Sequence, residues 1–227
     1  MLLAATACAR EQGGMAQAAP AGPFDGEKAL AYVRTQLDFG PRVPGTDAHR
    51  AAGDWIAAAM LERADTVIEQ RWEHRTADGR TIPLRNIFAR FNPGAAQRVL
   101  YVTHWDSRPR SESASDSARR LLPVPGANDG ASGTAMLIAL GDLLEAAPPR
   151  IGVDFLFVDG EDYGEFGPPD VDVLLGAQYF AQHPPVANYQ PIFGVLWDMV
   201  GDRDLEFEQA AAVRDRIRRL KEASLAG

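Results

Sequence analysis

Apolar residues near the start of the chain recur at helical spacing. Between residues 25 and 40 they lie three or four positions apart, which predicts an amphipathic helix capped by Asp25. A second, alanine-rich helix is predicted from a cap at Thr46 or Asp47 to about residue 64. Residues 66–75 and 81–91 then change to a strand pattern around an ADG turn, and residues 98–106 follow an NPGA turn. These three segments predict a β-meander.

From residue 130 onward, helical and strand patterns alternate. Helices are predicted at 130–146 and 174–182, and strands at 151–158 and 192–200. The two strands are nearly continuous apolar runs, which predicts burial on both faces and parallel pairing. We therefore expect an α/β fold, a three-layer α/β/α sandwich whose mixed central sheet has an antiparallel meander entry and a parallel centre.

Two segments stand apart from this alternation. Residues 107–126 are polar and too long for a simple connection, so they form either a flexible excursion or a loop over a site. A charged helix is predicted at 209–225.

Composition narrows the function classes. The chain of 227 residues carries a net charge of −8, a balance that repels phosphate backbones and argues against a nucleic-acid partner. Its single cysteine, Cys8, excludes an intramolecular disulfide and a cysteine-cluster metal site. Any metal must therefore be held by His, Asp or Glu.

The N-terminal segment has the composition of a targeting sequence. The run MLLAATAC ends at Cys8, and an Ala/Gly/Pro-rich stretch follows as far as Pro23. This resembles a bacterial lipoprotein signal, so we expect anchoring through a lipidated Cys8 and an extracytoplasmic location, either periplasmic or at the cell envelope. The alternative is a disordered segment 1–23. We expect one catalytic domain at 24–227, and no later apolar run approaches the ~20 residues of a membrane span.

Acidic residues follow the predicted strands. In parallel α/β sheets, ligands bind beyond the carboxyl ends of the strands. His104 and Asp106 end one strand on the same side of the backbone, and Asp129 precedes the next helix. Residues 159–162 and Asp198 follow the next two strands. A turn acid, an N-cap or a solvated loop explains each one alone, but together they predict a metal site of oxygen and imidazole ligands with a carboxylate base.

The segments HWDSR, GANDGASG, VDGED and WDMVG resemble, in this order, the motif set of the zinc aminopeptidase and glutaminyl-peptide cyclotransferase superfamily. The segments FGPRVPGT and NIFARFNPGA resemble its bacterial glutaminyl cyclase branch. The resemblance covers most of the chain. It implies one or two zinc ions as cofactor and peptide or protein N-termini as substrate.

The resemblance also implies a role for each matched residue. His104 and Asp198 would hold one zinc, Asp129 would bridge two zinc ions, and Asp162 would hold the second. Asp106 would orient the imidazole of His104, as carboxylates commonly do for a metal-bound histidine.

Glu161 would be the general base, and two reactions remain open. In a glutaminyl-peptide cyclotransferase, Glu161 moves a proton from the α-amine of an N-terminal Gln to the departing ammonia, and Asp198 forms a hydrogen bond nearby. In a metalloaminopeptidase, Glu161 takes a proton from the water that attacks the first peptide bond. We expect the cyclotransferase.

One expected ligand has no counterpart in the chain. The resemblance implies a histidine well downstream of Asp198 that completes the second zinc site, but the last histidine is His183. We therefore expect a C-terminally incomplete chain that binds zinc weakly at the Asp162 site and turns over little substrate. The alternative from another class is an inactive, truncated peptide-binding protein.

Overall fold

The computed structural model describes residues 24–205. The N-terminal segment 1–23 and the helix predicted at 209–225 lie outside the described residues. In the described part the elements are, in chain order, α1 (Gly26–Asp38), α2 (Asp47–Leu61), β1 (Thr66–Arg75), β2 (Thr81–Phe91), β3 (Arg98–His104), a 3-10 turn (Arg119–Leu121), α3 (Ala131–Ala146), β4 (Gly152–Val158), α4 (Leu175–Gln182) and β5 (Phe193–Leu196).

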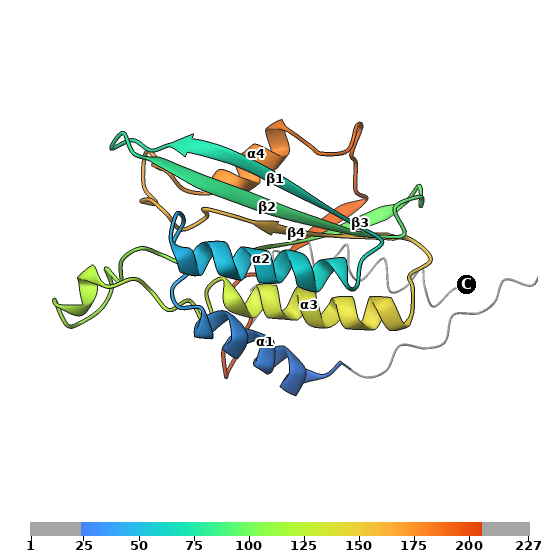
Figure 1. The fold of residues 1–227 in the computed structure, drawn as a ribbon, viewed down its shortest axis with the longest axis horizontal. Coiled ribbons are helices and arrows are strands. Elements are labelled where there is room, and N and C mark those ends of the chain that lie inside the picture. The colour runs from blue at the N-terminus through green and yellow to red at the C-terminus, as the bar shows by residue number, and fades with distance from the viewer. Residues whose placement is uncertain (1–23, 206–227) are drawn as a thin grey trace, which may run out of the picture.

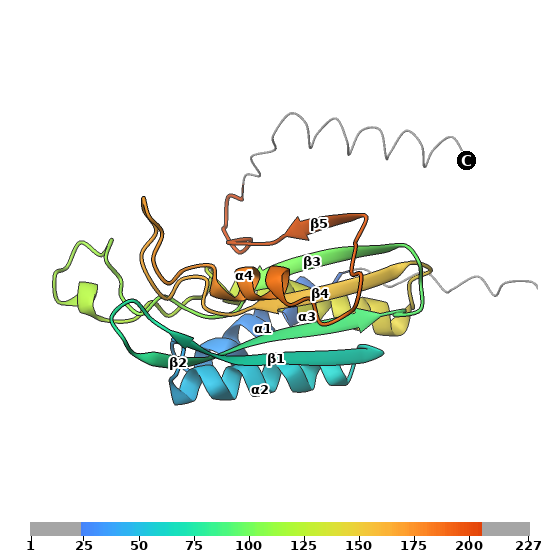
Figure 2. The same ribbon diagram turned by 90° about the horizontal axis from the view of Figure 1, so that it is seen from above.

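The layers are those of the expected α/β/α sandwich. Helices α1, α2 and α3 lie on one face of the sheet, and α4 lies on the other (Figures 1 and 2). Among residues 24–205, no helix has the length and apolar character needed to cross a membrane.

The first two helices begin at polar caps. The Asp25 side chain accepts a hydrogen bond from Lys28 N at 2.9 Å, and the Thr46 side chain accepts one from His49 N at 3.2 Å. Each cap satisfies a main-chain amide that has no partner within its helix. The predicted caps are confirmed, with Thr46 in that role for α2. This helix ends at Leu61, before the predicted end near residue 64.

The strand order is β1-β2-β4-β3-β5, which corrects the predicted meander. Strand β4 lies between β2 and β3, antiparallel to the former and parallel to the latter. All seven residues of β4 are buried, so a central position suits it better than the edge. The crossover through α3 brings β4 back alongside β3. Strand β5 ends at Leu196 instead of residue 200, and Met199 follows with φ of 50°, which breaks the extended backbone.

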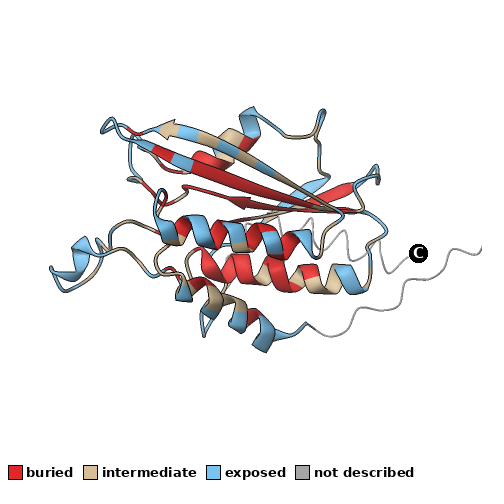
Figure 3. Ribbon diagram, viewed as in Figure 1, coloured by how far each residue is buried: buried red, intermediate tan, exposed pale blue. Residues whose placement is uncertain are grey.

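The core occupies both faces of the central strands. Ile87 and Phe155 pack toward α2 and α3, whereas Phe88 and Leu156 pack toward α4. Figure 3 shows the resulting buried stripe through the centre of the molecule. Successive residues of β4 are therefore buried on opposite faces, which explains its nearly continuous apolar sequence pattern.

The carboxyl ends of β3 and β4 and the start of α3 meet at one edge of the sheet. Residues 107–126 leave from this edge and project away from the helices (Figure 1, left). Every predicted metal ligand ends β3, follows β4 or β5, or precedes α3.

Candidate metal centre

His104 is the last residue of β3, and its imidazole is 1% exposed. Its Nδ1 lies 3.3 Å from Oδ1 of Asp106. The fully buried Asp106 also accepts hydrogen bonds from the main-chain amides of Glu161 at 3.1 Å and Asp162 at 3.2 Å. Asp106 therefore connects the end of β3 to the turn after β4 and fixes the direction of the imidazole.

The other imidazole nitrogen points into a group of carboxylates. His104 Nε2 lies 2.8 Å from Asp129 Oδ1 and 3.5 Å from Asp198 Oδ1. It is buried, yet it forms no well-aligned hydrogen bond with any residue from 24 to 205. A buried imidazole nitrogen surrounded by carboxylate oxygens in this way has the surroundings of a metal ligand.

Two compact groups of potential ligand atoms share His104. One contains His104, Glu161 and Asp198, and the other contains His104, Asp129 and Asp162, with the ligand atoms of each group within 4.8 Å of one another. The structure thus brings all the predicted ligands together at one edge. It also divides His104, Asp129 and Asp198, the set inferred for one zinc, between the two groups.

Asp129 does not cap α3. The N-cap is Gly130, with φ of 83° and no side-chain hydrogen bond to the helix. A Cβ atom at Gly130 would lie 2.5 Å from the carbonyl oxygen of Asp106, so this close approach requires glycine. The ordinary N-cap explanation for Asp129 is therefore wrong, and its carboxylate faces His104 instead.

Asp159 belongs to a different network from its neighbours Glu161 and Asp162. It is fully buried, and its two oxygens lie 2.9 and 3.0 Å from Nε2 of His49. It also accepts a hydrogen bond from Arg85 N at 2.7 Å. The acidic turn after β4 therefore divides into one structural carboxylate and two that face the metal ligands. His49, which the sequence analysis did not single out, forms part of the structural half.

Crowding of carboxylates changes the proton affinity of the cluster. Burial, and then the charge of Asp129, raises the pKa of Asp162 to about 7. Burial is also the largest cause that raises the pKa of Glu161. Burial alone would lower the pKa of His104, but nearby carboxylates, with Asp106 first, raise it well above 6.5. A bound cation would replace these protons, as metal ions do at imidazole and carboxylate ligands.

The donor set fits zinc. Zinc in catalytic sites takes imidazole nitrogen and carboxylate oxygen ligands, and a further carboxylate commonly orients the histidine. Here His104 supplies the nitrogen, Asp106 orients it, and Asp129, Asp162 and Asp198 supply oxygens.

Two arginines near the cluster were not among the predicted site residues. Arg108 Nη1 lies 3.6 Å from Oδ1 of Asp162, and its Nε donates to Glu112 at 3.0 Å. Arg42 is fully buried beneath the cluster. Both occur in segments that carried the family resemblance, but no pattern of spacing distinguishes a buried arginine from one on the surface.

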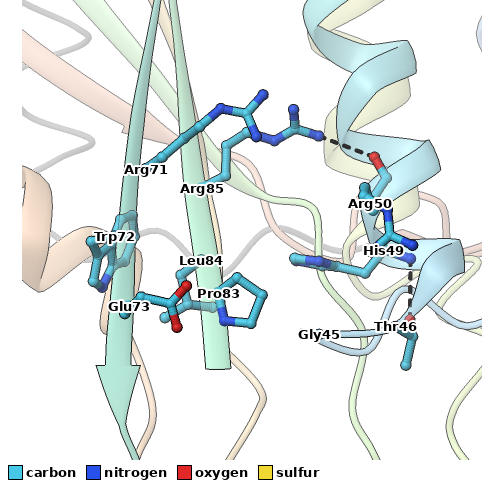
Figure 4. Close-up of a pocket in the computed structure, with 10 residues that line it drawn as sticks. All are labelled: Gly45, Thr46, His49, Arg50, Arg71, Trp72, Glu73, Pro83, Leu84 and Arg85. Carbon is cyan, nitrogen blue, oxygen red and sulfur yellow. Dashed lines mark hydrogen bonds between the residues drawn. The ribbon is translucent and has the colours of Figure 1, made fainter. Parts of the chain in front are cut away.

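Two cavities lie close to the centre without including its ligands. One, of about 370 Å³, lies between α2 and the β1–β2 hairpin, with His49 and Arg85 on its wall (Figure 4). The other, of about 770 Å³, is lined by Arg110, Tyr163 and Glu165 among others. Tyr163, which follows Asp162 in the chain, is part of its lining, but none of the candidate metal ligands is.

Comparisons with known proteins identify the family of the chain and proteins of similar fold. Residues 86–224 match the model of peptidase family M28. A probable zinc metalloprotease of Leptosphaeria maculans is 33% identical over 127 residues, which is 52% of this chain and 28% of that one. The curated relatives are longer, since this chain spans 28%, 45% and 39% of three of them.

Two solved structures from Bacteroides thetaiotaomicron share the fold. A glutaminyl cyclase bound to N-acetylhistamine aligns with a TM-score of 0.82 and 34% identity over 91% of this chain and 74% of that one. A leucine aminopeptidase precursor aligns with a TM-score of 0.82 and 34% identity over 91% and 75%. The fold and the family of zinc-dependent enzymes are therefore those predicted. The similar structures include both a glutaminyl cyclase and a leucine aminopeptidase precursor.

Proposed function

The chain belongs to peptidase family M28, and we propose that it is a zinc-dependent enzyme that acts on peptide N-termini as a glutaminyl-peptide cyclotransferase. The observation that carries this proposal is the group of carboxylates around the buried Nε2 of His104, which forms no well-aligned hydrogen bond within residues 24–205. The similarity to glutaminyl cyclases from several bacteria supports the reaction type.

Four side chains would hold zinc: His104, Asp129, Asp162 and Asp198. When bound, zinc would polarise the substrate carbonyl and so favour attack at its carbon. Asp106 keeps the imidazole of His104 in place because it accepts a hydrogen bond from Nδ1. It also accepts hydrogen bonds from the main-chain amides of Glu161 and Asp162.

Glu161 is the general base of the proposed reaction. Its raised pKa and its position in one of the two ligand groups suit a carboxylate that accepts and returns a proton. The α-amine of an N-terminal Gln attacks the side-chain carbonyl, and Glu161 accepts the proton that the amine loses. Glu161 then returns it to the nitrogen of the former side-chain amide, which leaves as ammonia. Asp198 would accept a hydrogen bond from the same amine.

A zinc aminopeptidase is the second candidate. The observation in its favour is the equally close structural similarity to a leucine aminopeptidase precursor. The same residues would serve, with Glu161 accepting a proton from water in place of the amine. The two reactions therefore differ in whether water reaches the substrate carbonyl.

The groove of about 770 Å³ gives the rest of the peptide a place to lie. Its lining includes Tyr163, which follows Asp162 in the chain, Arg110, and residues of the turn between β1 and β2. An enzyme that acts on the first residue of a long chain needs an open exit for the remaining residues. We propose that this groove serves as that exit.

Parallel assays on the zinc-loaded protein distinguish the candidates. We expect low turnover from this chain, with faster release of ammonia from Gln-initiated peptides than of free leucine from Leu-initiated peptides. Dominant leucine release would establish the aminopeptidase instead. Peptide binding without either product would establish a non-catalytic peptide-binding protein.

We also propose that Cys8 is lipidated and anchors the chain on the extracytoplasmic side of a membrane. The run MLLAATAC supports this proposal. Palmitate labelling in a bacterial host, compared between the wild-type chain and Cys8→Ser, tests it. Equal labelling of both chains would contradict it.

A further inference from the structure

Arg42, in the loop between α1 and α2, is fully buried. Its guanidinium donates to three main-chain carbonyls: Nε to Trp105 at 3.0 Å, Nη1 to Pro125 at 3.0 Å and Nη2 to Gly126 at 2.6 Å. Within residues 24–205, no carboxylate forms an ion pair with it. A buried guanidinium normally pairs with a carboxylate, so one devoted to main-chain oxygens needs an explanation.

The three carbonyls belong to the two segments that carry metal ligands. Trp105 directly follows His104, whereas Gly126 lies three residues before Asp129. The main-chain carbonyl of Arg42 also accepts a hydrogen bond from Ser107 N at 3.1 Å. Arg42 therefore bonds to both ends of the 107–126 excursion, where the two ligand-bearing segments come together.

The backbone packs closely around the guanidinium. Gly126 has φ of 71°, and a Cβ atom there would lie 2.5 Å from Nη2 of Arg42. A Cβ atom at Gly130 would lie 3.6 Å from the same nitrogen and 3.3 Å from Cε1 of His104. The arginine, the two glycines and His104 thus form one packed unit, and a shift of the guanidinium would move the ligands with it.

We propose that Arg42 is a positioning residue of the zinc centre, which closes the neck of the 107–126 excursion and thereby sets the separation of His104 and Asp129. Without this bridge, the ends of a long polar loop would sample many separations, and zinc binding would have to restrict them. This inference rests on the proposed zinc site. Residues that orient metal ligands typically change metal affinity by about 10–100-fold when replaced.

The charge of Arg42 supports the same role. Burial lowers the pKa of Arg42 to about 10, and the charges of Asp106 and Asp129 oppose that decrease. The guanidinium therefore remains protonated at neutral pH and keeps all its hydrogen bonds. It also places a permanent positive charge beneath a cluster of carboxylates.

Zinc affinity of the whole chain is the measurement that tests this role. The dissociation constant would be measured by competition with a chromogenic chelator for the wild-type chain, Arg42→Met and Arg42→Lys. Visible absorption of the Co²⁺-substituted proteins would report the ligand geometry. Lysine keeps the charge and can reach one carbonyl, but it cannot span all three.

Arg98→Met is the matched control. Arg98 is also a buried arginine, but it pairs with Asp154 at the opposite end of β3 from His104. Its replacement should lower stability as a buried arginine replacement does, without moving the metal ligands. A general loss of stability is thereby separated from a loss of ligand positioning.

We expect Arg42→Met to weaken zinc binding about 10–100-fold and to alter the Co²⁺ spectrum, with Arg42→Lys intermediate and Arg98→Met within about twofold of wild type. Wild-type affinity in a folded Arg42→Met, or equal weakening in Arg98→Met, would overturn the proposal. If Arg42→Met does not fold, wild-type affinity in Arg42→Lys would overturn it. Absence of zinc binding by the wild-type chain would instead refute the zinc site itself.

Discussion

Strands β3 and β4 carry a charged cluster at each end, and the two clusters differ in how their charges are compensated. At the start of β3, Arg98 forms two hydrogen bonds to Asp154, at 2.5 and 2.9 Å. Asp154 also accepts from Arg90 at 3.2 Å and from Tyr189 at 2.9 Å. At the other end, carboxylates gather around a histidine with too few cations.

The difference separates structure from chemistry. The Asp154 cluster is fully paired, so it stabilises the fold and has no capacity left to bind a ligand. In the His104 cluster, burial and then neighbouring negative charge raise the pKa values of Asp162 and Glu161, and a bound cation would offset this repulsion. In this fold, buried carboxylates without enough cationic partners therefore indicate a candidate binding site, whereas fully paired ones indicate a structural role.

The largest expected effect is on turnover. Glu161→Gln removes the proposed base, and activity should fall by about 10²–10⁴-fold, with little change in the free energy of unfolding. Initial rates of ammonia release measure this. Glu145→Gln, on the exposed end of α3, is the control and should match wild type. A modest loss in Glu161→Gln would exclude it as the base.

The next effect is on stability at the opposite end. Asp154→Asn leaves the buried Arg98 without its partner charge, and the free energy of unfolding should fall by about 3–5 kcal/mol. Urea unfolding measures this loss. Zinc affinity should stay at the wild-type value, and a joint loss of both would show that the two ends are not independent.

A smaller effect is expected for the carboxylate that orients the histidine. Asp106→Asn weakens the hold on His104 and on the amides of Glu161 and Asp162, so zinc affinity should fall about 10–100-fold. Chelator competition gives the dissociation constant. Asp142→Asn, which disrupts an ion pair with Arg63 away from the cluster, should leave zinc binding unchanged.

The smallest effect is a pH dependence of the metal-free protein. Because the pKa of Asp162 is about 7 when folded and 3.8 otherwise, the folded state holds an extra proton between these values. The contribution of protonated Asp162 to the free energy of unfolding is therefore complete below about pH 4 and is lost as pH rises toward 7. We expect a loss of about 1 kcal/mol, since Asp129 and Asp198 leave the site partly open to water.

Thermal unfolding between pH 4.5 and 8 in a chelating buffer measures this slope. Asp162→Asn should flatten it because the titrating group is gone. Added zinc should reverse it, since a metal ion binds the deprotonated carboxylate. A slope that persists in Asp162→Asn would assign the titration to another group.

Local sequence patterns predicted the bounds of the strands better than they predicted the order of the strands in the sheet. Strands β1 and β2 match their predicted ranges because two turn signals bound an alternating pattern. The position of β4 between β2 and β3 was not predicted, because strand pairing depends on the path of the chain and not on the pattern within one strand.

The site shows the same limit at the scale of single residues. Strand ends predicted that His104, Asp129 and Asp198 would share one edge, and the structure brings them together. The opposite directions of Asp159 and Glu161 could not be predicted, because they depend on Gly160, whose φ of 64° turns the chain between them. Arg42 was not identified because its partners are carbonyls, which every sequence contains.

The hydrogen bonds of Arg42 to both ends of the 107–126 loop affect which sequence changes the protein can tolerate. Both ends of this loop are bonded to Arg42, so its outer part can vary in length or sequence while the ligands stay in place. Insertions there would change what approaches the centre without rebuilding it. The excursion is therefore the segment to exchange when one scaffold is adapted, by evolution or in the laboratory, to different peptides.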